Sequence, residues 1–322
     1  MPRPHIEPFV DREVPFKKMT LPGFPKGMHY KMLSLDTDTG ACSMTVMFEP
    51  GYELPPGMSY SEMELFVMTG YVEMEGQKHG PGTYICLPAG VSLPAMKMPR
   101  GITGLMFYNY GEPSFVESDE DHPLAERHRL IKVNAYDDMQ WSSTNFFPAT
   151  APGCLVKVLK FDERTQAFTF LYCMTPNFWQ DNVSYHDCAE ESYHIRGTSW
   201  MMQSGNLPTG SYSWRPPYVN HGPFASKYGA LVLGRTDSRL CNHFHFNPWT
   251  TPGENLERAA SRLQHCKPEL YRWVATGDHN HPVDLDFTGD HGHENGDVPH
   301  HHGDQDLEHS HVHRPRRVKR KK

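Results

Sequence analysis

Ser184-Tyr-His186-Asp-Cys-Ala-Glu190 is the stretch that decides the fold of this chain, together with the phrase Gly210-Ser-Tyr-Ser-Trp-Arg-Pro-Pro-Tyr-Val-Asn-His221 that follows it. The two stretches carry two imidazoles and one carboxylate on short segments that are typical of neighbouring strands. Such a ligand set holds a divalent metal and leaves coordination positions open for chemistry. The sequence therefore predicts a metal site built from His186, Glu190 and His221.

Composition limits the class of protein. The chain has 322 residues, of which 38% are hydrophobic, so it can bury one large core or two of ordinary size. Its 26 glycines and 28 prolines divide it into short segments rich in β-branched and aromatic residues, which predicts a mostly β architecture. The formal net charge of -7 gives no general attraction to nucleic acid or to an anionic membrane.

Cysteine usage and the N-terminal residues indicate the compartment. Seven cysteines are an odd number and lack CxxC spacing, so neither a disulfide framework nor a structural zinc site is indicated. The first residues lack the apolar run of a signal peptide, and no segment approaches the roughly 20 apolar residues that span a bilayer. We therefore expect reduced thiols in a soluble, cytoplasmic protein.

The chain repeats itself at a period of about 126 residues, which is the size of one domain. The segments 30–48 and 156–172 share one pattern of strand, turn and strand, and the lead-in segments 9–16 and 132–141 match as well. Turn residues follow at spacings expected for an antiparallel barrel or sandwich. Two tandem β-rich domains are predicted from this repeat.

Four parts of the chain are predicted from these patterns. They are an N-terminal barrel over residues 1–120, a C-terminal barrel over 121–250, a short helical segment over 251–276 and a tail over 277–322. The tail holds ten of the 21 histidines and almost no apolar residues, so it cannot bury a core and is expected to be disordered. It either binds zinc, nickel or copper loosely or is a solvated tail without a role.

The two motif stretches resemble the cupin superfamily. Its first motif carries a His-x-His pair, a glutamate and a glycine, and its second a glycine, a Pro-x-Gly phrase and a histidine. His186, Glu190 and His221 fall at ligand positions, while Ser184 occupies the place of the first histidine and Tyr218 that of a glycine. What the resemblance implies is a jelly-roll barrel with a metal held inside by three protein ligands.

The first copy of the repeat keeps the scaffold of these motifs without the ligands. Its second motif retains the glycines and the proline but has Leu93 where the metal histidine belongs, and Gly57, Ser59 and Met63 fall at the other ligand positions. Over about residues 5–250 the chain looks like a bicupin, similar to double-cupin proteins related to ChrR-type cupins. The resemblance implies one degenerate and one retained site.

Iron(II) is the expected metal, with manganese, nickel, copper or zinc as alternatives. Strand alternation places His194, Ser192 and Arg196 on the same side of their strand as Glu190, and Tyr212 on one face with Trp214. The residues expected to bind or orient the substrate, besides the metal ligands, are Tyr185, His194, Tyr212 and Arg215.

The leading hypothesis for function is a metal-dependent dioxygenase that cleaves a C–C bond of a small oxygenated substrate. The alternatives are a non-catalytic sensor of metal or small ligands, as in ChrR-like cupins, and a metal-free structural bicupin. The expected partners are a small-molecule substrate and a second copy in a homodimer, with no membrane and no specific nucleic acid.

Overall fold

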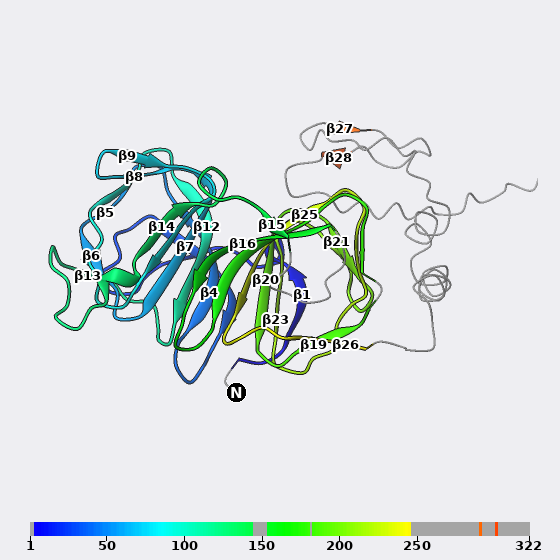
Figure 1. Ribbon diagram of the computed structural model, residues 1–322. Coiled ribbons are helices and arrows are strands. Elements are labelled where there is room, and N and C mark those ends of the chain that lie inside the picture. The colour runs from blue at the N-terminus through cyan, green and yellow to red at the C-terminus, as the bar shows by residue number, and fades with distance from the viewer. Residues whose placement is uncertain (1–2, 144–152, 181, 246–289, 292–299, 302–322) are drawn as a thin grey trace, which may run out of the picture.

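The computed structural model describes residues 3–143, 153–180, 182–245, 290–291 and 300–301 (Figure 1). Within these residues nearly all regular structure is strand, apart from two short 3-10 turns, η1 at Asp11–Glu13 and η2 at Arg127–Arg129. The predicted mostly β class is confirmed. No helix in this described part is long and apolar enough to cross a membrane.

The predicted helical segment 251–276 lies outside the described residues, as does the tail, except for two strands of two residues each. These are β27 (Asp290–His291) and β28 (His300–His301), which pair with each other.

Two seven-stranded antiparallel sheets form the body of the molecule, one in each half (Figure 1). The sheet of the N-terminal unit has the order β14-β10-β7-β12-β4-β3-β2, and the sheet of the C-terminal unit has the order β1-β23-β20-β25-β17-β16-β15. The strands of the first sheet are β2 (Lys17–Lys18), β3 (Met28–Leu35), β4 (Cys42–Phe48), β7 (Glu62–Gly70), β10 (Thr83–Leu87), β12 (Ile102–Asn109) and β14 (Ile131–Asn134). Those of the second are β1 (Ile6–Val10), β15 (Ser142–Ser143), β16 (Cys154–Phe161), β17 (Phe168–Met174), β20 (Glu190–Gly197), β23 (Ser211–Arg215) and β25 (Ala230–Thr236).

Smaller sheets complete each unit, and they match strand for strand. In the N-terminal unit they are β5-β11-β8-β9 and β13-β6, with bounds Tyr52–Leu54 (β5), Gly57–Met58 (β6), Val72–Met74 (β8), Gln77–His79 (β9), Met96–Met98 (β11) and Val116–Glu117 (β13). In the C-terminal unit they are β18-β24-β21-β22 and β19-β26, with bounds Phe178–Gln180 (β18), Ser184–His186 (β19), Ser199–Met201 (β21), Gly205–Leu207 (β22), Phe224–Ser226 (β24) and Asn242–Phe244 (β26). The internal repeat is therefore visible in the order of every sheet.

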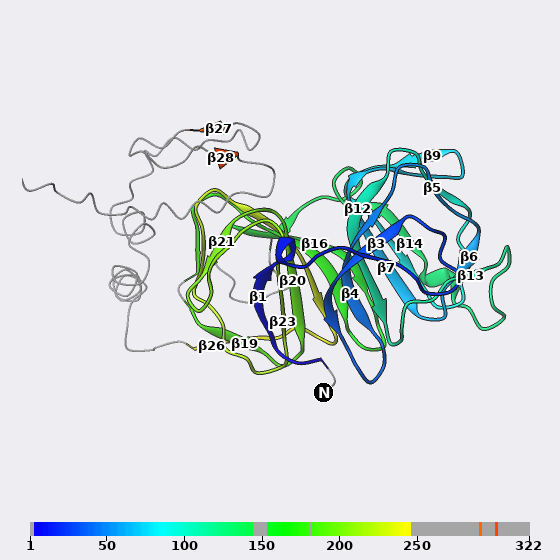
Figure 2. The same cartoon turned by 180° about the vertical axis from the view of Figure 1, so that it is seen from behind.

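The two units exchange their lead-in strands. β1, from the start of the chain, pairs antiparallel with β23 at the edge of the C-terminal sheet, and β14 pairs in the same way with β10 of the N-terminal sheet. Figure 2 shows the dark blue β1 beside the green and yellow strands of the C-terminal unit. The predicted domain boundaries at residues 120 and 250 stay predictions, but each sheet contains one strand from the other half.

Buried apolar residues form separate clusters inside and between the units. The interior of the N-terminal unit is rich in methionine, with Met28, Met74 and Met98 almost fully buried. A second cluster joins the two large sheets and includes Phe66 and Tyr212. Because the outer face of each large sheet is buried against the other, strands of this region carry buried residues on both faces, and some of these residues are polar.

Candidate metal centre

Three short segments of the C-terminal unit carry the predicted ligands. His186 is the last residue of β19, Glu190 is the first residue of β20, and His221 follows β23 in an isolated bridge with Ser184. The backbone N–H groups of Ser184 and His221 each donate to the other's carbonyl, at 2.8 Å, so the segments that bear the two histidines are fixed side by side.

One glycine of the motif is required by backbone geometry. Gly197 ends β20 with a φ of +82°, and a Cβ at that position would lie 2.3 Å from the carbonyl oxygen of Gly229. Only a residue without a side chain fits this turn. By contrast, Tyr218 takes a φ of +69°, at the position where the cupin motif has glycine. Its backbone N–H donates to the carbonyl of His186 at 2.8 Å, which ties this left-handed turn to the site.

The three predicted ligands converge. One donor atom from each of His186, Glu190 and His221 lies within 4.8 Å of the others, which makes them the cluster with metal-ligand chemistry in the described part of the chain. His186 Nε2 is 3.4 Å from Glu190 Oε2, and the two imidazole centroids are 4.7 Å apart. Both histidines are buried.

The protonation states of these groups suit a cation. Burial raises the pKa of Glu190, but His186, His221 and Arg215 outweigh burial and hold that pKa at about 2, so the group is a carboxylate. Burial, with Arg215 and His186, lowers the pKa of His221 to about 3, so its imidazole is neutral. His221 Nδ1 is 2.9 Å from the carbonyl oxygen of Val219, to which it donates, and its Nε2 keeps a free lone pair.

The polar groups left over also fit a metal. His186 Nδ1 is buried and has no hydrogen-bond partner in the described chain. Two neutral imidazoles and one carboxylate are the donors that a divalent first-row metal takes, and buried polar groups in a folded protein are normally satisfied. The residues present therefore fit a divalent ion.

A cavity of about 110 Å³ opens in front of the three ligands. Its polar lining includes Arg215, His194, Gln180 and Asn242. Arg215 is buried, with Nη1 3.6 Å from Glu190 Oε2 and Nη2 3.4 Å from Met201 Sδ. The apolar walls are formed by Cys154, Phe170, Tyr172, Met174, Phe178, Leu207, Phe224, Leu240 and Phe244.

His194 lies in this cavity, where the strand alternation of β20 predicts it. Its Nε2 is 2.8 Å from the Ser199 hydroxyl. Burial, with the charge of Arg215, lowers the pKa of His194 to about 4, so the imidazole is neutral near pH 7. The structure thus brings Arg215 and His194, two of the four predicted substrate residues, to the same cavity as the ligands.

The other two predicted substrate residues lie elsewhere. Tyr185 projects from the opposite face of β19, where its ring stacks on His243 with centroids 4.8 Å apart. Tyr212 faces the other unit, and its hydroxyl donates to Glu191 Oε2 at 2.7 Å and contacts Ser34. Neither residue lines the metal cavity. Tyr185 stands between the cavity residues Ser184 and His186, and Tyr212 stands three residues before the cavity residue Arg215; alternation sends residues an odd number apart to opposite faces.

Arg196 is also displaced from the face that alternation predicts. The pairing of β20 with β25 shifts between His194 and Arg196, which is an irregularity of the bulge type. Arg196 is exposed as a result.

Gln180, Asn242 and the aromatic walls were not predicted from the sequence. They come from β18, β17 and β26, which carry no motif spacing. The internal repeat was the signal that could have found them. These strands match strands of the first copy and surround the motif strands.

The equivalent positions of the N-terminal unit hold no ligand set. Gly57 and Leu93 form an isolated bridge that corresponds to the bridge of Ser184 with His221. Ser59 and Met63 occupy the positions of His186 and Glu190, and Met63 and Leu93 belong to the methionine-rich core.

The duplicated sheets have the fold of two tandem cupin barrels, and the imidazole and carboxylate cluster lies inside the second. The family described as Domain of unknown function (DUF4437) matches residues 23–243, and the chain belongs to this family. No curated protein matches the chain.

Solved structures with the same fold share little sequence with the chain. A proposed dioxygenase of Nostoc punctiforme superposes with a TM-score of 0.68 at 20% identity, over 76% of this chain and 87% of that one. A proposed glyoxylate-induced protein of Pseudomonas aeruginosa gives 0.52 at 15%, over 72% and 87%. An oxalate decarboxylase gives 0.50 at 11%, over 81% and 84%. These likenesses establish the fold. They leave the relation to ChrR-type cupins a prediction.

Proposed function

We propose that this protein is a metal-dependent enzyme that acts on a small, anionic, oxygenated compound, and that the reaction is the oxidative cleavage of a C–C bond. The single observation that carries the proposal is the convergence of His186, Glu190 and His221 at one end of a cavity. Three protein ligands leave positions of an octahedral ion open, as a reaction centre requires.

Iron(II) is the proposed metal, and manganese, nickel, copper and zinc fit the same donors. When bound, a divalent ion supplies polarisation of a substrate oxygen and, in the case of iron, electrons for dioxygen chemistry. The chain's contribution is to keep the His221 imidazole neutral and the Glu190 carboxylate ionised near pH 7. The low pKa values of His221, about 3, and of Glu190, about 2, meet this requirement.

Arg215 supports an anionic substrate. In the described residues, its guanidinium contacts only Glu190 Oε2, at 3.6 Å, and Met201 Sδ, at 3.4 Å. A guanidinium has five N–H donors, so most of its capacity for hydrogen bonds is unused in a buried position. Once Glu190 is engaged by a cation, a carboxylate or enolate of the substrate becomes the natural partner of Arg215.

The size of the cavity restricts the substrate further. A volume of about 110 Å³ has room for roughly four water molecules, at about 30 Å³ for each water. Aromatic and aliphatic walls exclude bulk water around the charged groups, which strengthens their electrostatic interactions with the substrate. Gln180 and Asn242 are positioned to hydrogen-bond the substrate's remaining oxygen atoms.

The reaction type is supported by the superposition on the proposed dioxygenase of Nostoc punctiforme. The oxalate decarboxylase of the same fold marks a second candidate reaction, in which the C–C bond of a small carboxylate is cleaved without net consumption of oxygen. Fold alone does not choose between these reactions.

The experiment measures oxygen consumption and carbon dioxide release by the iron-loaded full chain with a panel of small oxo-carboxylates, diketones and phenols. We expect oxygen uptake with at least one anionic member, and its loss in the His221→Ala variant. His243→Ala is the matched control, because His243 is exposed and lies outside the cavity.

Each alternative predicts a different result. Carbon dioxide release without oxygen uptake would replace the dioxygenase by a decarboxylase. Metal binding without turnover of any panel member would favour the sensor, whose predicted helical segment lies outside the described residues. Equal metal content in wild type and His221→Ala would contradict the metal site itself.

A further inference from the structure

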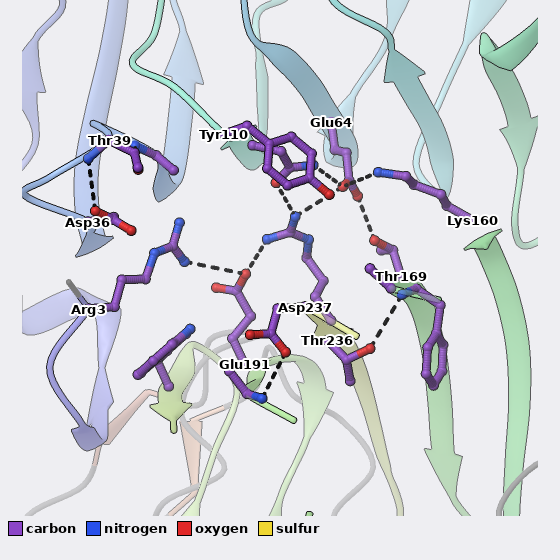
Figure 3. Close-up of a pocket in the computed structure, with 17 residues that line it drawn as sticks. Arg3, Asp36, Thr39, Glu64, Tyr110, Lys160, Thr169, Glu191, Thr236 and Asp237 are labelled. Atoms are coloured by element: carbon purple, nitrogen blue, oxygen red, sulfur yellow. Dashed lines mark hydrogen bonds and ion pairs between the residues drawn. The ribbon is translucent and has the colours of Figure 1, made fainter. Parts of the chain in front are cut away.

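A cavity larger than the one at the candidate metal centre lies between the two units. Its volume is about 280 Å³, and it is lined by Arg3, Asp36, Thr39, Ala41, Glu64, Asn109, Tyr110, Lys160, Ala167, Phe168, Thr169, Ala189, Glu191, Trp214, Arg235, Thr236 and Asp237. Figure 3 shows the charged side chains of both units converging on this space. None of the residues with a role in the proposed reaction lines it.

The floor of this cavity is an ion network whose carboxylates are saturated with donors. Glu64 is 1% exposed and accepts hydrogen bonds from Tyr84, Thr169 and Asn109, while Arg235 lies 3.0 Å and Lys160 3.3 Å from its Oε1. A carboxylate with this many donors has no acceptor capacity left for a ligand.

Glu191, in the C-terminal unit, is held in the same manner by groups from both units. Its Oε2 accepts from Tyr212 at 2.7 Å and from Ser43 at 2.6 Å, and its Oε1 pairs with Arg235. The two glutamates are thus paired with Lys160 and Arg235, and Lys160 also pairs with Glu62. A ligand can therefore bind only to the polar groups that surround this network.

Three charged groups around the floor have capacity to spare. Arg3 makes its contacts in the described chain through Nη1, to Ser34, Ser43 and, at 3.8 Å, Glu191. The Nη2 and Nε donors of Arg3 remain available. In the view of Figure 3 the guanidinium of Arg3 lies between Asp36 and Glu191.

The two acidic groups at the rim use one oxygen each. Asp36 Oδ1 accepts from the backbone N–H of Thr39 at 3.0 Å, and Asp237 Oδ1 accepts from that of Ala189 at 2.9 Å. In the described chain, Oδ2 of each aspartate has no hydrogen bond. The space thus offers free donors of Arg3 and a free carboxylate oxygen on each of Asp36 and Asp237, with Asp36 on one side of the Arg3 guanidinium and Asp237 beyond Glu191 (Figure 3).

We propose that the cavity between the units is a second ligand site, and that it takes a small zwitterion of the α-amino acid type. The ligand's carboxylate binds Arg3, and its ammonium group binds Asp237. A simple anion leaves Asp237 unpaired, and a simple cation leaves Arg3 unpaired. At about 30 Å³ for each water, 280 Å³ corresponds to roughly nine waters, which is enough for an amino acid.

The test is isothermal titration calorimetry of the full chain with glycine, L-serine and L-glutamine, and with acetate and methylammonium as singly charged probes. We expect one amino acid site per chain and at least tenfold weaker binding of both singly charged probes. Arg3→Gln and Asp237→Asn should each weaken amino acid binding about tenfold. Asparagine keeps an Oδ1 acceptor for the Ala189 N–H, so the fold is retained. Lys17→Gln, on the exposed strand β2, is the control.

Four outcomes overturn the proposal. They are the absence of heat with every amino acid, acetate binding as tightly as glycine, unchanged affinity in both Arg3→Gln and Asp237→Asn, and loss of amino acid binding in His221→Ala. The last outcome would place the ligand on the metal. Since the proposed function makes no use of this cavity, its failure and the failure of the enzyme assay are independent.

Discussion

Replacing Arg235 by methionine (Arg235→Met) is expected to reduce the free energy of unfolding by about 3–5 kcal/mol, which is the cost of breaking a buried ion pair from one side. Arg235 lies 3.0 Å from Glu64 and pairs with Glu191, and both carboxylates are at most 5% exposed. One cation serves two buried anions, but the loss is not doubled. Lys160 stays 3.3 Å from Glu64, and Arg3 stays 3.8 Å from Glu191. Methionine retains an apolar stem against the ring of Phe107, where the guanidinium carbon now lies 4.1 Å from the centroid.

The assay is urea unfolding followed by tryptophan fluorescence, with the free energy taken by linear extrapolation. Arg164→Met is the matched control, because Arg164 pairs with Glu126 on the surface and is 61% exposed. We expect the control to lose less than about 1 kcal/mol. Adding Glu191→Gln to Arg235→Met should recover part of the stability, since one uncompensated charge disappears. Equal losses in Arg235→Met and Arg164→Met would refute this reasoning. They would mean that removal of Arg235 does not leave a buried carboxylate without its partner.

Three further predictions concern the metal centre and its scaffold. Chelation should remove about one ion per chain and lower the melting temperature, and elemental analysis should find that ion absent from His221→Ala but present in His243→Ala. In the metal-free protein the folded pKa of His194, about 4, lies below its unfolded value of about 6.5, so stability is complete above pH 6.5 and falls by at most about 1.4 kcal/mol per pH unit down to pH 4. His221 contributes a pH dependence of the same sign. Denaturant titrations should find that the free energy of unfolding of His194→Gln declines less steeply with falling pH than that of wild type. An equally steep decline would contradict the assignment to His194. Gly197→Ala should destabilise the fold by roughly 2–4 kcal/mol, because it combines a left-handed backbone with a backbone clash. The control Gly51→Ala has a φ of +83° and nothing within 4 Å of its added Cβ, so it should lose only about 1 kcal/mol. Similar losses in the two variants by calorimetry would exclude the clash.

The sequence was sufficient to predict that His186, Glu190 and His221 lie together, because this information is local. His186 and Glu190 are four residues apart around one turn, and His221 follows a strand that pairs with the strand of Glu190. Spacing within a hairpin determines which side chains meet, so the convergence of the three groups could be expected without coordinates.

The faces of the neighbouring strands could not be predicted with the same certainty. Alternation correctly puts Tyr212 and Trp214 on one face of β23, but it does not say which face looks inward. Only the position of Arg215, beside Glu190, decides that Tyr212 looks toward the other unit. The shift after His194 is set by the pairing of β20 with β25, a long-range contact that exposes Arg196.

The network between the units was missed for a related reason. Glu64 and Glu191 occupy matching places in the repeat, and their partners Thr169 and Ser43 come from the opposite copy. A search for interacting residues within one copy of the repeat cannot find an ion network whose members come from both copies.

The exchange of lead-in strands has a consequence for the edges of the two large sheets. A protein with only one of these units would have had an unpaired sheet edge where β1 or β14 now lies, and a second molecule donating the same strand would have closed it. In the present chain both strands are supplied from within, because each unit donates its lead-in strand to the other unit. The matched contacts of Glu64 with Thr169 and of Glu191 with Ser43 follow the same exchange between the two halves.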